Sequence, residues 1–164
     1  MLTINEYRKV ESLEEAYELN QKKNNKIIAG GVWMKIGDRR IATAIDLSGL
    51  GLDQITETDT EFVIGAMTTL REIEKHAGLA AYTDGAIRES VRHIVGVQFR
   101  NCATVGGSIF GRFGFSDVLT VFLAMDTQVE LYHAGMVSLK EFIDMPYDND
   151  ILVRIIIKKD NRKA

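Results

Sequence analysis

Residues 100–126 constrain the fold more than any other stretch of this chain. They read RNCATVGGSIFGRFGFSDVLTVFLAMD and hold Gly106, Gly107, Gly111 and Gly114. Glycine in a helix interior costs roughly 1 kcal/mol relative to alanine, so a cluster this dense is not expected to form helix. Glycines instead allow positive φ angles and close approach to the main chain. We therefore predict a loop whose exposed N–H groups, beside the start of the next helix, suit a phosphate.

A helix start follows these glycines, and a second glycine pair lies upstream of them. Ser116 or Asp117 is a suitable N-cap for the helix that follows the glycines. Upstream, residues 26–29 read as a short buried strand that runs directly into Gly30-Gly31. Two strand-to-glycine turns in one small domain can hold a pyrophosphate from both sides. Neither is a GxGxxG loop in a βαβ unit or a GxxxxGK[ST] loop, so the two common nucleotide fingerprints are absent.

Composition excludes several classes of function. The 164 residues form one domain or two small lobes, with 46% hydrophobic and 26% charged residues. The net charge of −3 and the absence of a basic stripe argue against nucleic acid. The single cysteine, Cys102, excludes an intrachain disulfide or a cysteine-based metal site, and we expect it to be buried. No metal-ligand spacing, signal core or bilayer-length apolar run is found, so we expect a cytoplasmic protein with no membrane partner.

The pattern along the chain predicts an α+β fold rather than a doubly wound sheet, because helices and strands alternate irregularly. A Ser12/Glu15 capping box opens the first predicted helix. Thr69, Asp84 and Ser138 are the expected caps of three later helices. The helices are predicted at residues 12–23, 32–36, 69–77, 84–94, 117–125 and 138–144. Strands are predicted at 26–29, 43–47, 127–132 and 151–157, with a hairpin over 55–66. Looser sequence at 45–52 suggests a smaller lobe at 1–50 and a larger one at 51–164.

Taken together, these segments resemble the FAD-binding (medium) subunit of the molybdenum hydroxylases, the family of xanthine dehydrogenase and carbon monoxide dehydrogenase. The segments that carry the resemblance are IAGG at 28–31, IGAMTTL at 64–70, QFRNCATVGGSI at 98–109, Ser116-Asp117 with its apolar helix, and TQVEL at 127–131. The resemblance extends from about residue 5 to about residue 158. It implies the two-lobed α+β fold of PCMH-type flavoproteins, which bind FAD outside the Rossmann family. Members usually continue into a C-terminal lobe, which we expect to be absent here.

The resemblance also implies where FAD would bind. The two glycine loops would close on its pyrophosphate, Asp117 would bond its sugar-alcohol part, and apolar Ile94 and Leu152 would line the flavin or adenine. No side chain is expected to be catalytic, because the flavin itself does the redox chemistry. The expected cofactor-binding residues are Ile28, Ala29, Gly30, Gly31, Val32, Trp33, Met34, Ile94, Thr104, Gly106, Gly107, Ser108, Asp117 and Leu152.

The sequence departs from the family pattern in both loops. Val32-Trp33 stand where the family usually has polar residues, so a side-chain bond to phosphate is lost. Ser108 replaces an asparagine, and the Phe-Gly-Arg-Phe segment at 110–113 adds bulk. Trp33 is more often a packing residue than a flavin stacker. Arg112 is interpreted as a solvated surface charge or, less often, as a phosphate cation that offsets the missing donors.

Two functions follow from the resemblance and its departures. The first is an FAD-binding electron-transfer subunit of a molybdenum hydroxylase-like oxidoreductase. Its partners would be an iron–sulfur subunit and a molybdopterin subunit, and its acceptor would be NAD or another oxidant. The alternative is an assembly or interaction module that keeps the fold without the flavin. A free-standing flavoenzyme has less support, because no motif places a proton donor.

Overall fold

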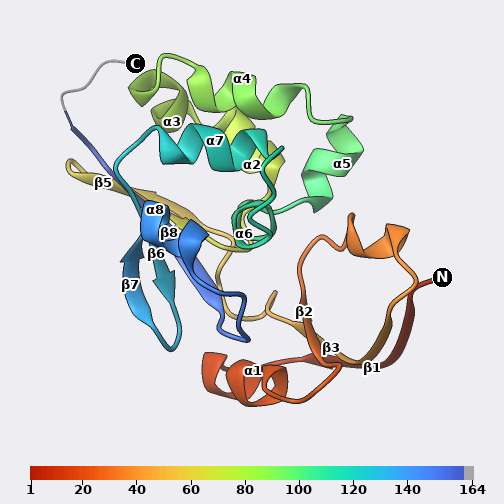
Figure 1. The fold of residues 1–164 in the computed structure, drawn as a ribbon. Coiled ribbons are helices and arrows are strands. Elements are labelled where there is room, and N and C mark those ends of the chain that lie inside the picture. The colour runs from red at the N-terminus through yellow and green to blue at the C-terminus, as the bar shows by residue number, and fades with distance from the viewer. Residues whose placement is uncertain (161–164) are drawn as a thin grey trace.

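The computed structural model describes residues 1–160 and contains two β-sheets with helices around them (Figure 1). The smaller sheet is parallel and has the order β1-β3-β2. The larger sheet is antiparallel and has the order β4-β5-β8-β6-β7. Its strands are β4 (Ile55–Glu57), β5 (Glu61–Gly65), β6 (Thr127–Leu131), β7 (Gly135–Ser138) and β8 (Leu152–Lys158), and those of the smaller sheet are β1 (Thr3–Lys9), β2 (Lys26–Ile28) and β3 (Arg40–Asp46).

The helices divide between the two sheets. Figure 1 shows α1 (Leu13–Asn20) beside the smaller sheet and most of the others gathered on one side of the larger sheet. A short 3₁₀ turn, η1 (Met34–Ile36), follows β2. The remaining helices are α2 (Leu70–Lys75), α3 (Ala77–Tyr82), α4 (Ala86–Arg92), α5 (Val97–Cys102), α6 (Val105–Phe110), α7 (Asp117–Leu123) and α8 (Leu139–Asp144). The fold is therefore α+β, as the sequence predicts.

Two groups of buried apolar side chains hold the sheets together. The larger group fills the space between the antiparallel sheet and its helices, with Phe62, Phe122 and Phe142 fully buried. The smaller group packs Ala16 of α1 and Ile45 of β3 with residues before and within β8. Because this second group draws on both sheets, it holds them in one arrangement. The lobe boundary at residue 50 stays a prediction.

Side-chain caps explain where several helices begin. Thr69 and Ser138 form complete capping boxes, and Ser116 rather than Asp117 caps α7. Ser12 accepts a bond from the N–H of Glu15, but the Glu15 carboxylate accepts from Glu11 rather than from Ser12. The predicted caps are therefore confirmed at the serine and threonine positions, with only half of the first box formed.

Two predicted features differ from the structure, and several elements were not predicted. Asp84 does not cap α4; Gly85, with a φ of 85°, precedes that helix. β2 is an edge strand that is exposed at Lys26, rather than a buried strand. β1 was not predicted, because all seven of its residues are exposed and give no buried face to detect. The β7 strand and the helices α3 and α5 were not predicted either.

The prediction that the central glycines lie outside helices is wrong for the first pair. Gly106 and Gly107 form part of α6. A Cβ atom at Gly106 would lie 2.5 Å from the carbonyl oxygen of Ala66, so only glycine lets α6 approach the turn after β5 this closely. This contact offsets the low helix propensity of glycine.

A buried ion pair joins α2 to α5. The Arg100 guanidinium donates to both carboxylate oxygens of Glu74, at 2.8 and 3.4 Å, and to the carbonyl of Ile94 at 3.2 Å. Burial alone would raise the pKa of Glu74, but hydrogen bonds from Arg100 and Arg71 outweigh it and hold this pKa below its ordinary value. The pair thus joins α2 to α5, and the bond to Ile94 holds the segment between α4 and α5.

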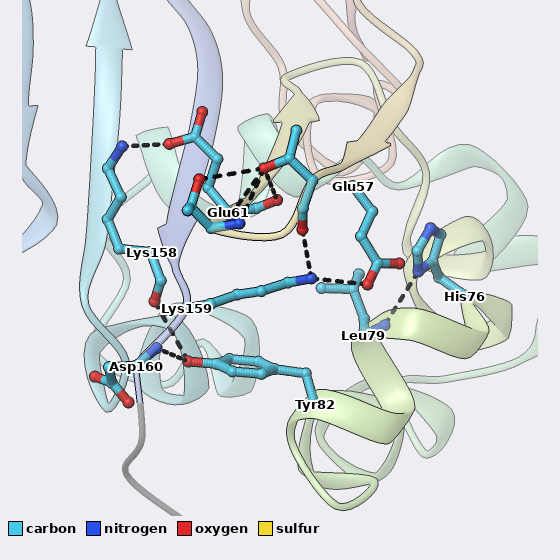
Figure 2. Close-up of polar contacts among 10 residues, drawn as sticks. Glu57, Glu61, His76, Leu79, Tyr82, Lys158, Lys159 and Asp160 are labelled. Carbon is cyan, nitrogen blue, oxygen red and sulfur yellow. Dashed lines mark hydrogen bonds and ion pairs between the residues drawn. The ribbon is translucent and has the colours of Figure 1, made fainter.

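The end of β8 is tied to the neighbouring hairpin and to α3 (Figure 2). Lys158 pairs with Glu61, and Lys159 pairs with Glu57 at 2.9 Å. The Tyr82 hydroxyl donates to the carbonyl of Lys158 at 3.3 Å. These contacts anchor the last strand of the antiparallel sheet.

The two helical glycines should differ in how strongly an alanine substitution changes the stability of the protein. Gly106→Ala should lower the free energy of unfolding by about 1–3 kcal/mol, because its Cβ meets main-chain atoms that cannot rotate away. Gly107→Ala should change it by less than about 1 kcal/mol, because its Cβ meets only the Thr104 hydroxyl, at 3.1 Å. Urea unfolding of both variants checks this. Equal losses would contradict the packing account.

The buried ion pair predicts a large, pH-dependent effect. Glu74→Gln should destabilise the protein by about 3 kcal/mol at neutral pH, because Arg100 is left buried without its anion. The matched change Glu89→Gln, in an exposed pair with Arg92, should cost less than about 1 kcal/mol.

The lowered pKa of Glu74 gives stability that is present above the ordinary carboxyl pKa of about 4.3. That stability is lost as the pH falls through the lower pKa of the folded state. The difference between wild type and Glu74→Gln should therefore shrink in acid. A difference that stays constant or grows there would be inconsistent with the pair.

Candidate functional site

A cavity of about 410 Å³ lies between the loop after β2 and the starts of α6 and α7. Most of the predicted cofactor-binding residues line it: Ala29, Gly30, Gly31, Val32, Trp33, Met34, Ile94, Thr104, Gly107, Ser108 and Asp117. The lining is mainly apolar, and Asp117 is its one ionisable side chain. The structure thus brings together residues that lie far apart in the sequence.

Three predicted residues lie elsewhere. Gly106 and Leu152 line a neighbouring cavity of about 330 Å³, which shares Ala29, Met34 and Gly107 with the first. Ile28 lies in β2 and lines neither cavity. The loop from residue 29 to residue 34 therefore separates two adjoining hollows.

Gly30 brings the loop after β2 against the end of α5. A Cβ atom there would lie 1.8 Å from the carbonyl oxygen of Cys102, so no larger residue fits without movement. Gly31 has a φ of 66°, a left-handed conformation that glycine adopts without strain. The Cys102 side chain is exposed, so the prediction that it is buried is wrong.

The loop after β2 also carries free hydrogen-bond donors. Within residues 1–160, the main-chain N–H groups of the five successive residues from Gly30 to Met34 have no acceptor in the protein. Consecutive N–H groups in a turn form a concave anion site. The lining holds no cation, so these main-chain donors are the groups there that favour an anion.

The start of α6 does not supply the exposed donors expected from the sequence. The N–H groups of Val105, Gly106 and Gly107 are each bonded within the protein, at 2.9, 2.9 and 3.1 Å. Their acceptors are the carbonyls of Thr68 and Ala66 and the hydroxyl of Thr104. That prediction is wrong, because docking α6 on the turn after β5 consumes its first amides.

Four aromatic rings line the cavity. Trp33 contacts Phe99 edge-on at 6.4 Å and Phe115 at 5.9 Å, and Phe115 stacks on Phe113 at 5.2 Å. Trp33 and Phe115 remain 59% and 67% exposed, so Trp33 is not a core packing residue. Sequence reasoning missed Phe99 and Phe115. The alternating Phe-Gly-Phe at 113–115 was the available signal.

Arg112 is neither a solvated surface charge nor a phosphate cation of the cavity, the two interpretations that the sequence suggested. Its guanidinium lies 4.0 Å from the centre of the Phe142 ring and 4.5 Å from that of Tyr147, with Phe110 at 5.6 Å. It also donates to the carbonyl of Met145, and it lines neither cavity. Cation–π contacts of this kind replace water around the charge. Arg112 therefore anchors the segment that carries the phenylalanines.

Asp117 lies in the first turn of α7, where the helix dipole favours its negative charge. Ser116 provides the cap, accepting from Leu119 N–H at 3.2 Å. The Asp117 carboxylate has no bonding partner within residues 1–160 and lines the cavity. It is thus available to accept bonds from hydroxyl groups of a ligand.

Residues 1–160 provide neither of two further classes of site. No helix there is long and apolar enough to cross a bilayer. No group of three or more His, Cys, Asp and Glu side chains there is placed to hold a metal ion.

Comparison with known proteins gives the family. Residues 3–159 match the family described as the FAD binding domain in molybdopterin dehydrogenase. The uncharacterized protein YgfM of Escherichia coli (strain K12) is 29% identical over 167 residues, which cover 97% of this chain and 61% of YgfM.

Solved structures show the same fold. Reconstituted CO dehydrogenase from Oligotropha carboxidovorans gives a TM-score of 0.83 at 24% identity, covering 96% of this chain and 60% of that one. Quinoline 2-oxidoreductase from Pseudomonas putida 86 gives 0.83 at 20% identity, covering 95% and 59%. This chain spans about three fifths of the length of these relatives. It belongs to the family of FAD-binding domains of molybdopterin dehydrogenases.

Proposed function

We propose that this protein binds FAD in the cavity beside the loop after β2 and transfers electrons as part of a molybdenum hydroxylase-like oxidoreductase. The observation that carries the proposal is the run of unpartnered N–H groups from Gly30 to Met34, in residues that line a cavity without a cation. A pyrophosphate matches such donors, since main-chain N–H groups bind anions well. Membership of the family supports FAD as the ligand.

The side chains that line the cavity also fit FAD. The departure at Val32-Trp33 removes a side-chain hydroxyl but leaves the main-chain donors of the same loop intact. The free Asp117 carboxylate is placed to accept bonds from the sugar-alcohol hydroxyls. Apolar lining residues such as Ile94 exclude water from the ring system. When bound, FAD supplies the electron-transfer chemistry; the protein binds and orients it.

The cavity lined by Gly106 and Leu152 offers room for the second arm of a dinucleotide. It adjoins the first cavity through Ala29, Met34 and Gly107. The pyrophosphate would then lie at the loop between the two hollows. This arrangement accounts for Gly106 and Leu152, which do not line the first cavity, but not for Ile28, which lines neither.

The partners in the proposal come from the family resemblance. Electrons would arrive from a molybdopterin subunit through an iron–sulfur subunit and leave to NAD or another acceptor. Activity is expected only together with these partner subunits. We place this assembly in the cytoplasm.

A flavin-less assembly module is the second candidate. The specific observation in its favour is that Trp33 and Phe115 leave aromatic surface exposed at the cavity mouth. Such a patch also suits protein contacts. Titration with FAD separates the two candidates.

The proposal predicts a flavin spectrum. Purified protein should take up FAD and retain its visible absorption after desalting, because the donors of the loop after β2 are preorganised. The same titration with the iron–sulfur and molybdopterin subunits present tests a site that partners complete. Correctly folded protein that takes up no FAD under either condition would refute the proposal and leave the assembly module.

Alanine substitutions at two glycines in this region test the main-chain donors of the loop after β2. Gly30→Ala should abolish or strongly weaken FAD binding, because its Cβ would force the loop away from Cys102. The control Gly37→Ala should bind normally, because its Cβ meets only ordinary contacts and its φ is −83°. Isothermal titration with FAD, after circular dichroism confirms folding, measures both. Wild-type affinity in Gly30→Ala would argue against this loop.

A further inference from the structure

The aromatic rings at the cavity mouth are the largest feature that the proposed function leaves unexplained. Trp33 and Phe115 are mostly exposed although they contact each other, at 5.9 Å between ring centres. They come from segments more than eighty residues apart in the sequence. Val95, on the same rim, is 76% exposed with a φ of 50°, a strained conformation for a β-branched residue. Exposed aromatic surface and stored strain both concentrate at binding sites.

The chemistry of the loop limits which class of ligand can cover these rings. Trp33 carries one of the five free N–H groups, so its ring and the anion-binding main chain belong to one loop. An occupant that satisfies both features has phosphate groups joined to a flat aromatic ring. This describes a nucleotide and not an apolar peptide.

The position of Asp117 indicates which aromatic ring of the ligand would stack on Trp33 and Phe115. Phe115 precedes this free carboxylate by two residues, and both line the same cavity. Under the proposed function, Asp117 accepts from the sugar-alcohol hydroxyls, and the ring attached to that sugar alcohol is the isoalloxazine. The adenine, on the other arm, would be directed away from Phe115.

We propose that Trp33 and Phe115 form an aromatic clamp that stacks on the isoalloxazine ring of FAD. The inference rests on the proposed function and adds the residues that hold the ring. Aromatic side chains favour stacked contacts with flat π systems.

Both rings have rigid support. The cation–π contact of Arg112 with Phe142 and the N-cap at Ser116 hold the two ends of the segment that carries Phe115. Phe99 supports Trp33 edge-on. The clamp substitutes aromatic contact for the polar side chains that the family usually has beside Gly30-Gly31.

The single tryptophan makes the clamp directly observable. Titration with FAD and with FMN should quench the fluorescence of Trp33, because a stacked flavin accepts its excitation energy. ADP should bind without comparable quenching, because it has the phosphates but not the flavin. Free N-acetyltryptophanamide, titrated in parallel, corrects for light absorption by the flavin.

Variants test the contribution to affinity. Trp33→Ala and Phe115→Ala should each raise the Kd for FAD about 10- to 100-fold, measured by flavin absorbance. Trp33→Phe should restore most of the affinity, because it keeps an aromatic ring. Ile36→Ala is the matched control: Ile36 is 77% exposed and lies near Trp33 in sequence but does not line the cavity, so the Kd should not change.

The outcomes separate this inference from the proposed function. Protein that binds FAD with the wild-type Kd in both Trp33→Ala and Phe115→Ala would overturn the clamp and leave the FAD site standing. Quenching by ADP equal to that by FAD would place adenine at the rings and also overturn the clamp. Failure to bind FAD at all would instead remove the proposed function on which the clamp rests.

Discussion

The close approach of Gly30 to the Cys102 carbonyl is the constraint on which the site depends. A Cβ atom would lie 1.8 Å from that oxygen, so the loop after β2 reaches the end of α5 only with glycine there. A second contact of the same kind seats Gly106 of α6 against Ala66. The first contact places the loop after β2 against α5, the second seats α6 on the turn after β5, and the cavity lies between that loop and the starts of α6 and α7. The glycines therefore matter because of what approaches them, and not only because of their conformational freedom.

This arrangement assigns different roles to the two glycine pairs. The amides at the start of α6 are used to hold the helix in place, whereas those from Gly30 to Met34 are free. The proposed anion site thus lies on the loop after β2, and α6 acts as its support. Side-chain substitutions in the free loop leave its main-chain donors unchanged, so Val32-Trp33 is compatible with a phosphate ligand.

Sequence predicted the features that depend on local chemistry. Thr69, Ser116 and Ser138 cap the helices because their side chains bond amides three residues away, and such spacing can be read directly. Features that depend on distant contacts were missed or wrong. The helical state of Gly106 depends on Ala66, forty residues earlier, and β1 shows no buried face because it is an exposed edge. The family resemblance supplied most of the cavity residues, but not Phe99 and Phe115, which only the fold brings to Trp33.

The central claim is that the main chain from Gly30 to Met34 holds the pyrophosphate. Two-dimensional ¹H–¹⁵N NMR of labelled protein, titrated with FAD, tests this most directly because each amide reports separately. The account predicts that the largest downfield shifts fall on the amides of Gly30 to Met34, while those of Val105 to Gly107 move little because they are already bonded. Shifts centred on the start of α6, with the loop after β2 unchanged, would contradict it.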